Sequence, residues 1–282
     1  MVKCDICKKR DALYYRTYSG HKLCTICLER ILSKTVKRII GESGLLSPGS
    51  RILAVVRPSE PMHSLASLLL LSIVESKFNI ELHVLAPSQL NKNNVIDSIV
   101  DRIGRWVKSS SLIEEFPLPR SRGPIHCIRY ERAWALSRAR EINADVIAYP
   151  LSRTCINTIG LEALLSSRTD ALSEALPTIP WTSPPILSPI ANIEGEALSA
   201  YAFLKGLHLD PLCTTTIPAK IPLLSILGNR PELEFSSSKT IIKLSKKMNL
   251  GYCEVCGGYT RRGERICRYC VESGASLLFS RQ

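Results

Sequence analysis

The sequence predicts an α/β protein with a doubly wound parallel sheet, flanked at its N- and C-terminal ends by four-cysteine zinc modules. Two observations lead to this fold class. Eight of the eleven cysteines fall into four Cys-x-x-Cys pairs, two near each end of the chain. Between them, apolar runs of strand length alternate with segments of helical periodicity. In an intracellular chain, pairs of such pairs indicate metal sites rather than disulfides.

The first module contains Cys4, Cys7, Cys24 and Cys27, and sixteen residues separate its two pairs. A hairpin of that length brings the second pair back to the first. Tetrahedral Zn²⁺ takes four thiolates at about 2.3 Å, which leaves no open position, so the site is predicted to be structural. A basic helix over 28–40 follows, and glycines end it. We therefore expect an N-terminal zinc finger with its helix over residues 1–44.

The central domain is predicted over 45–248 and shows β-α alternation. Strands are expected at 51–56, 80–85, 113–116 and 145–149, and helices at 65–76, 95–107, 129–142, 158–166 and 194–206. Five prolines between 177 and 192 favour an extended crossover, with Ile186 in a short edge strand. Residues 217–247 are expected to be mixed and partly helical.

The last module, expected over 249–282, contains Cys253, Cys256, Cys267 and Cys270. Ten residues separate its pairs, and glycines supply its turns, as in a compact zinc ribbon. Two structural Zn²⁺ ions are thus predicted for the whole chain.

Positive charge is concentrated on the two cysteine-rich ends. Residues 1–38 carry +7 and residues 239–270 carry +6 of a total of +12, so the remainder sums to −1. Such a distribution is typical of proteins that bind a polyanion such as RNA, although a merely solubilising surface is the alternative. The candidate RNA-binding residues are Lys34, Lys37, Arg38, Lys246, Lys247, Arg261, Arg262, Arg265 and Arg268.

The loop after the first central strand is where an open α/β sheet binds its ligand. It reads Arg57-Pro-Ser-Glu-Pro-Met-His-Ser64, with two prolines and no glycine. A phosphate cradle needs backbone N–H groups that approach the anion closely, and proline has none. A loop without a nucleotide role is favoured, and Arg57, His63 and Ser64 are the candidate remnant of an anion site.

In the order of its zinc modules, basic helix and α/β domain, the chain resembles the tRNA 2-thiolation family, whose adenylating domain is of the pyrophosphate-loop type. The resemblance covers nearly the whole chain. It rests on both zinc motifs, on Leu46-Ser-Pro-Gly49 before Arg51-Ile-Leu-Ala-Val-Val56, and on Ala144-Asp-Val-Ile-Ala148. It implies an adenine nucleotide alpha-hydrolase-like fold and a protein that uses ATP to activate a tRNA uridine for sulfur transfer, assisted in many members by an Fe–S cluster on three cysteines.

This chain departs from the family where the family's chemistry lies. Only Ser64 matches the family's Ser-Gly-Gly-Lys-Asp-Ser loop, and Pro150-Leu-Ser-Arg-Thr-Cys155 replaces Gly-His-Asn-x-Asp-Asp. The family's first cluster cysteine falls on Pro124, its second on Cys127, and its third matches Cys213. Cys127, Cys155 and Cys213 are therefore either buried small hydrophobes, the favoured interpretation, or a rearranged Fe–S site. ATP binding is not expected.

Three functions remain open. The favoured one is a catalytically degenerate member of the family that binds tRNA, or another RNA, and supports tRNA sulfur modification as a partner subunit. The alternatives are an active sulfurtransferase with a remodelled site, and a zinc-stabilised protein-interaction scaffold. By resemblance we expect a homodimer, or a heterodimer with an active paralogue. The longest apolar stretch is too short to span a bilayer, so we expect a cytoplasmic protein.

Overall fold

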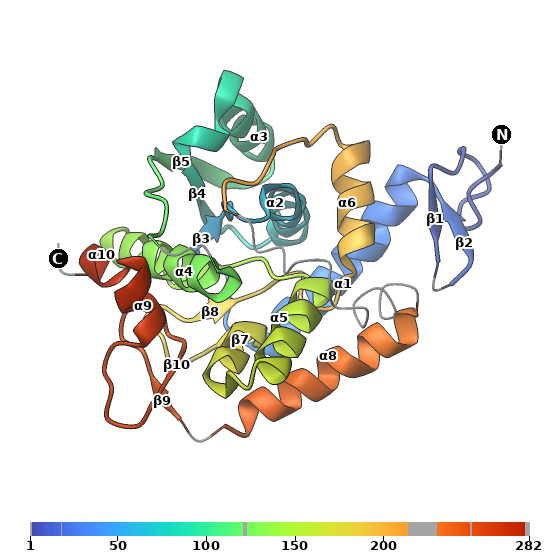
Figure 1. Cartoon of the computed structure of the whole chain (residues 1–282). Coiled ribbons are helices and arrows are strands. Elements are labelled where there is room, and N and C mark those ends of the chain that lie inside the picture. The colour runs from blue at the N-terminus through green and yellow to red at the C-terminus, as the bar shows by residue number, and fades with distance from the viewer. Residues whose placement is uncertain (1, 18, 121–122, 214–229, 249, 280–282) are drawn as a thin grey trace.

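A computed structural model describes residues 2–17, 19–120, 123–213, 230–248 and 250–279 (Figure 1). At its centre lies a six-stranded sheet of order β5-β4-β3-β6-β8-β7. Its strands are β3 Arg51–Val55, β4 Glu81–Pro87, β5 Lys108–Glu114, β6 Val146–Ala148, β7 Thr178–Ile179 and β8 Ile186–Leu187. All neighbours are parallel except β7, which runs antiparallel to β8. The predicted doubly wound α/β class is confirmed.

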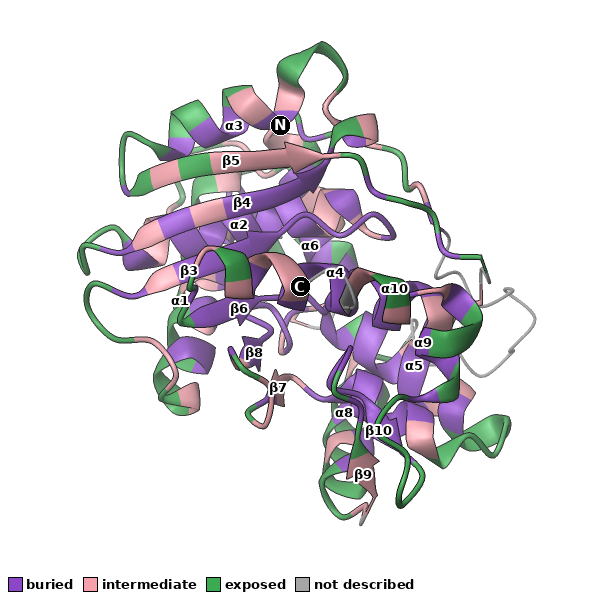
Figure 2. Ribbon diagram, turned by 90° about the vertical axis from the view of Figure 1, so that its left-hand side faces the viewer, coloured by how far each residue is buried: buried purple, intermediate pink, exposed green. Residues whose placement is uncertain are grey.

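The alternation of side chains along β3 divides the apolar core between the two faces of the sheet. Ile52 and Ala54 belong to one buried cluster, whereas Leu53 and Val55 belong to the other. Figure 2 shows β3 and β4 largely buried and the edge strand β5 partly exposed. Because both faces of the central strands are covered, these strands are apolar throughout rather than alternating.

The first face is covered by α1 Thr25–Ser43, α2 Pro61–Glu75, α3 Val95–Ile103 and α6 Gly195–Leu204. Helix α2 is buried on nearly all sides, since α1 and α6 pack against it. The N-terminal module, with strands β1 Tyr14–Arg16 and β2 His21–Leu23, is continuous with this layer through α1. Its Leu23 and Cys24 belong to the same buried cluster as Ile52.

The second face is covered by α4 Pro124–Glu141, α5 Arg153–Leu165 and α8 Pro231–Lys246. The C-terminal module packs on α4 and comprises β9 Gly251–Tyr252, β10 Tyr259–Thr260, α9 Arg268–Ser273 and α10 Ser276–Phe279. Short 3₁₀ turns occur at Ser88–Leu90, Lys92–Asn94 and Thr169–Ala175. Helix α8 runs from the side of α1 toward the C-terminal module (Figure 1).

Four helices begin earlier than predicted, the first of them, α1, by three residues. Helix α2 begins at Pro61 and α4 at Pro124, each with proline in its first turn. Proline is tolerated there because the first N–H groups of a helix have no intrahelical acceptor. Helix α5 begins at Arg153, since the Ser152 side chain caps it by accepting the Cys155 N–H at 3.1 Å.

Two strand predictions were wrong. The third strand is Lys108–Glu114 rather than 113–116, and its three serines are tolerated because β5 lies at the sheet edge. Ile186 does not lie in an edge strand, because β7 pairs outside it. Helix α3 ends at Ile103, just before Gly104. Of the mixed segment predicted at 217–247, residues 217–229 lie outside the described part, and α8 occupies most of the rest. Among the described residues, no helix is long and apolar enough to cross a bilayer.

Candidate functional site

The first predicted metal site is formed where the β1–β2 hairpin meets α1. The ligand atoms of Cys4, Cys7, Cys24 and Cys27 all lie within 4.8 Å of one another. Cys24 is the N-cap of α1, and Cys27 lies in its first turn. The Cys7 and Cys24 sulfurs are 3.9 Å apart, close to the edge of about 3.8 Å of a tetrahedron with 2.3 Å metal–sulfur bonds. The donor set therefore fits a tetrahedral metal ion.

The second site follows the same plan at the other end of the chain. Cys253, Cys256, Cys267 and Cys270 also lie within 4.8 Å of one another, and all four are buried. Two sulfur pairs, Cys253 with Cys270 and Cys256 with Cys267, are each 3.8 Å apart. Backbone N–H groups of Gly258 and Cys267 donate to the sulfurs of Cys256 and Cys253. Such donors stabilise thiolates, the form that binds a metal.

A buried arginine holds the C-terminal module against the sheet domain. Arg129 on α4 donates to Glu174 at 2.8 Å and to the carbonyl of Tyr259 at 3.1 Å. Burial opposes its charge, but Glu174 and the sulfurs of Cys256 and Cys267 keep its pKa well above the ordinary value. The hairpin fits so closely that a Cβ at Gly258 would lie 2.8 Å from Glu174 and 2.9 Å from Arg129.

The carboxyl end of β3, where α/β folds place a ligand, is filled by a second buried arginine. The Arg57 side chain is 0% exposed and pairs with the equally buried Glu131 of α4, Nε to Oε2 at 3.0 Å. Its other nitrogens donate to Glu60 at 3.1 Å, to the carbonyl of Pro150 at 3.0 Å and to Ser59 at 2.9 Å. The guanidinium is thus fully buried, and each of its three nitrogens donates to a protein acceptor.

Glu131 is saturated in the same way. Besides Arg57, it accepts the Ser59 N–H at 2.9 Å and the Tyr149 hydroxyl at 2.6 Å. Burial opposes the Arg57 charge, yet the carboxylates of Glu131 and Glu60 keep its pKa well above the ordinary value. Burial likewise raises the pKa of Tyr149, so its hydroxyl stays protonated as a donor.

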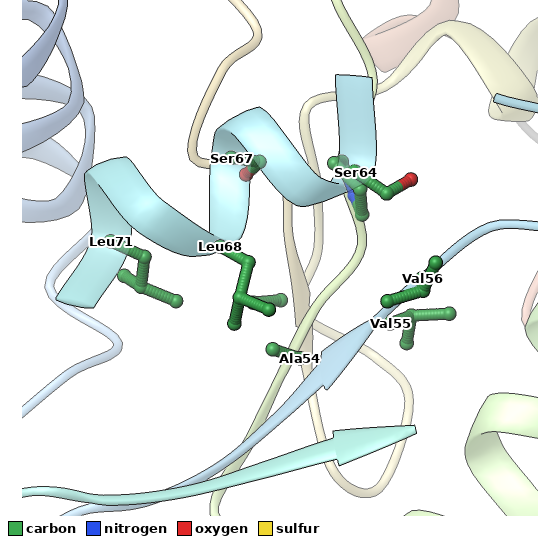
Figure 3. Close-up of a pocket in the computed structure, with 9 residues that line it drawn as sticks. Ala54, Val55, Val56, Ser64, Ser67, Leu68 and Leu71 are labelled. Carbon is green, nitrogen blue, oxygen red and sulfur yellow. The ribbon is translucent and has the colours of Figure 1, made fainter. Parts of the chain in front are cut away.

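The space left beside this network is small. Figure 3 shows Ser64, Ser67, Leu68 and Leu71 of α2 facing the end of β3. The cavity between them has a volume of about 10 Å³. A cavity of roughly 10–15 Å³ holds a single water molecule. No nucleotide fits into this cavity.

The predicted anion remnant does not form a cradle. Ser64 accepts the N–H of Arg57 at 3.0 Å and donates to the carbonyl of Glu60 at 2.7 Å. His63 lies 2.9 Å from the hydroxyl of Ser199 on α6, and its Nδ1 is 3.5 Å from Glu60. The three residues Arg57, His63 and Ser64 are therefore engaged within the protein, and a carboxylate stands where an anion would bind.

The three remaining cysteines do not converge. Cys127 and Cys213 are joined by a disulfide, with their Cα atoms 6.5 Å apart. Cys155 is buried 3.9 Å from Arg57, and burial raises the pKa of its thiol. Among the described residues, the groups of three or more metal-binding side chains are the two four-cysteine sets. The expectation of three free buried thiols was therefore wrong for Cys127 and Cys213, which are paired, and holds for Cys155.

All nine candidate RNA-binding residues are exposed: Lys34, Lys37, Arg38, Lys246, Lys247, Arg261, Arg262, Arg265 and Arg268. Three of them also have acidic partners, since Arg265 pairs with Glu254 at 2.8 Å, Arg268 lies 3.7 Å from Asp170 and Arg38 lies 4.0 Å from Glu42. Lys34 and Arg38 line a groove between α1 and the start of α8.

The buried charges of α4 were missed by the sequence analysis. Arg129, Glu131 and Arg132 are all fully or almost fully buried. A signal was available, because charged residues on α4 are distributed around the helix instead of forming one polar face. Their partners come from distant segments, so their identity could not be inferred from spacing.

The fold and the two sites define a doubly wound α/β protein with a four-cysteine metal-binding module at each end. Among solved structures, the chain is similar to the U34-tRNA thiolase NcsA from Methanococcus maripaludis, solved with its [4Fe-4S] cluster. The TM-score is 0.67 at 14% sequence identity, and the match covers 97% of this chain and 96% of that one. The two proteins therefore share a fold over nearly their whole lengths. No family model and no curated protein matches the sequence.

Proposed function

We propose that this protein is a catalytically degenerate relative of tRNA 2-thiolation proteins, which binds tRNA and supports sulfur modification without hydrolysing ATP. The fold shared with a tRNA thiolase supports the relationship. The single observation that carries the loss of ATP chemistry is the buried Arg57–Glu131 pair at the carboxyl end of β3. A nucleotide would have to displace a saturated ion pair, and breaking such a pair costs several kcal/mol.

RNA binding is supported by where the exposed cations lie. The cysteine-rich ends carry nearly all the net positive charge, and each contains a four-cysteine set that could hold a metal ion. We propose Zn²⁺ as the metal at both, because four cysteines at tetrahedral spacing suit it. The expected partner is an active paralogue, which would supply the adenylation that this chain lacks.

Calorimetric titration of the purified protein with Mg-ATP tests the degenerate site. We expect no heat of binding and no increase in melting temperature, whereas a ligand present at a hundred times its Kd would stabilise the protein by about 2.7 kcal/mol. A saturable ATP signal would favour an active sulfurtransferase with a remodelled site.

Binding of bulk tRNA, measured by anisotropy across a salt series, tests the RNA role. The affinity should fall steeply with salt through counterion release. If no tRNA binding is detected at low salt, the scaffold interpretation replaces the proposal. Iron analysis of anaerobically purified protein distinguishes Zn²⁺ from an Fe–S cluster, since a cluster would also absorb visible light.

A further inference from the structure

Helix α8 carries a row of three lysines, of which only Lys246 is among the nine candidate RNA-binding residues. The residues Phe235, Lys239, Lys243 and Lys246 are spaced four, four and three apart, so they share one side of the helix. All four are exposed, whereas Glu234, Ser238, Ile241 and Ser245 form the buried side. This row, hereafter the α8 lysine row, faces away from the sheet.

The lysines of the row have no acidic partners among the described residues. The ion pair that α8 does make joins Glu234, on its buried side, to Arg153 at 3.8 Å. Lys239 instead lies over the ring of Phe235, 4.2 Å from its centroid. Like charges four residues apart on a helix repel each other. An unneutralised row of this kind suits a polyanion that would relieve the repulsion.

The row begins at a groove lined by α1 and α8. This groove has a volume of about 800 Å³ and lies between α1 and the first turn of α8. Its cations are Arg16, Lys34, Arg38 and Arg153, against the carboxylates Glu194 and Glu232. Glu194 is paired with Arg153 and lies 3.8 Å from Arg16, so Lys34 and Arg38 are the lining cations outside this cluster. Clefts of about 300–1,000 Å³ accommodate ligands as large as a nucleotide.

Phe235 gives the groove an aromatic surface. Its side chain is 42% exposed, and the guanidinium of Arg153 lies 5.6 Å from the ring centroid. An exposed phenyl ring beside cations can stack an unpaired nucleobase while the cations hold the adjoining phosphates. A helix face that only contacts water would explain the exposed lysines, but it would not explain an exposed phenylalanine beside a cationic groove.

The row also connects the two basic ends. Helix α8 has sixteen residues, which corresponds to a length of about 24 Å. Its first turn lies beside Lys34 and Arg38 of α1, and its last turn leads to the C-terminal module (Figure 1).

We infer that single-stranded RNA follows the α8 lysine row, with its phosphates on Lys239, Lys243 and Lys246 and an unpaired base stacked on Phe235 in the groove. The inference rests on the proposed RNA-binding function and specifies the surface and the form of RNA. An acidic protein partner is the competing occupant, and selectivity for single-stranded over duplex RNA distinguishes the two.

The test uses the full chain and a labelled single-stranded oligoribonucleotide, with affinity measured across a salt series. The variant Lys239→Gln/Lys243→Gln/Lys246→Gln is compared with Lys77→Gln/Lys92→Gln/Arg105→Gln, which removes the same charge from exposed positions elsewhere. Each phosphate contact contributes about 0.7 to the salt slope of a single strand. The α8 variant should therefore lose about 2 units of slope and on the order of a hundredfold affinity at about 0.1 M salt.

Phe235→Ala provides the second arm. We expect it to weaken single-strand binding roughly five- to hundredfold, with the salt slope unchanged and duplex RNA binding unaffected. Equal losses in both triple variants, or no effect of Phe235→Ala, would overturn the inference while leaving RNA binding intact. If the wild-type protein binds no RNA, the proposed function itself fails. If the wild-type protein instead binds an acidic protein, and only the α8 variant loses that binding, the competing occupant is identified.

Discussion

Arg57 and Glu131 form an ion pair from which water is excluded on both sides. Their side chains are each 0% exposed, and Nε lies 3.0 Å from Oε2. The pair links the loop after β3 to α4 at the position where related folds bind a ligand. At this position the chain has buried charged side chains, and the cavity beside them measures about 10 Å³.

This pair predicts that removing Glu131 alone destabilises the protein more than removing both partners. Glu131→Ala would leave Arg57 buried without a counter-ion, so we expect a loss of about 3–5 kcal/mol in the free energy of unfolding. Urea denaturation measures it. The matched control is Glu141→Ala, which removes an exposed partner of Arg138 and should cost about 0–1 kcal/mol. Adding Arg57→Met to Glu131→Ala should recover part of the loss, and a purely additive further loss would refute the coupling.

Metal removal at the C-terminal module should change the fluorescence of Trp181, which is distant in sequence but contacts the module. Trp181 donates its indole N–H to the carbonyl of Gly257 at 2.9 Å and stacks on Tyr252, with ring centroids 4.3 Å apart. We expect Cys256→Ser to lower the metal content by about one equivalent, because a four-thiolate site loses a ligand. Elemental analysis and Trp181 fluorescence measure the two effects. Cys155→Ser, which lies outside both four-cysteine sets, should retain all the metal.

Cys155 should be unreactive in the native protein. It is 5% exposed, and burial raises the pKa of its thiol, so the reactive thiolate is scarce at neutral pH. Treatment with iodoacetamide at pH 7.5, followed by peptide mass spectrometry, should show labelling of Cys155 only after denaturation. Native labelling as fast as that of a free thiol would contradict the buried placement beside Arg57.

Acid should remove a stabilising contribution from Glu81. Lys108 and Arg51 donate to this carboxylate and lower its pKa to about 2. Because the folded-state pKa is depressed, the contribution is complete above about pH 5 and is lost as the pH falls toward 2. The difference in melting temperature between wild type and Glu81→Gln should therefore shrink with falling pH. Glu115→Gln, at an exposed position, should show no such trend.

The pattern of the sequence was sufficient for the metal ligands and most of the sheet. Cys24 and Cys27 bracket the first turn of α1, and such local geometry follows from spacing alone. The apolar run of β3 likewise predicts a strand covered on both faces. Two of the helix starts that differ from the prediction are those expected at 65 and 129, which lie at Pro61 and Pro124 in the structure.

The sequence by itself determined the fold class, the eight metal-binding cysteines and the absence of a phosphate-binding loop after β3. Only the tertiary structure decided which side chains occupy the carboxyl end of β3. Arg57 and Glu131 are 74 residues apart, and their pairing depends on how α4 crosses the sheet. The same holds for Phe235 and Lys34, which line one groove from opposite ends of the chain. Ligand spacing within a turn is a local property, whereas burial of a charge depends on segments whose approach no local pattern records.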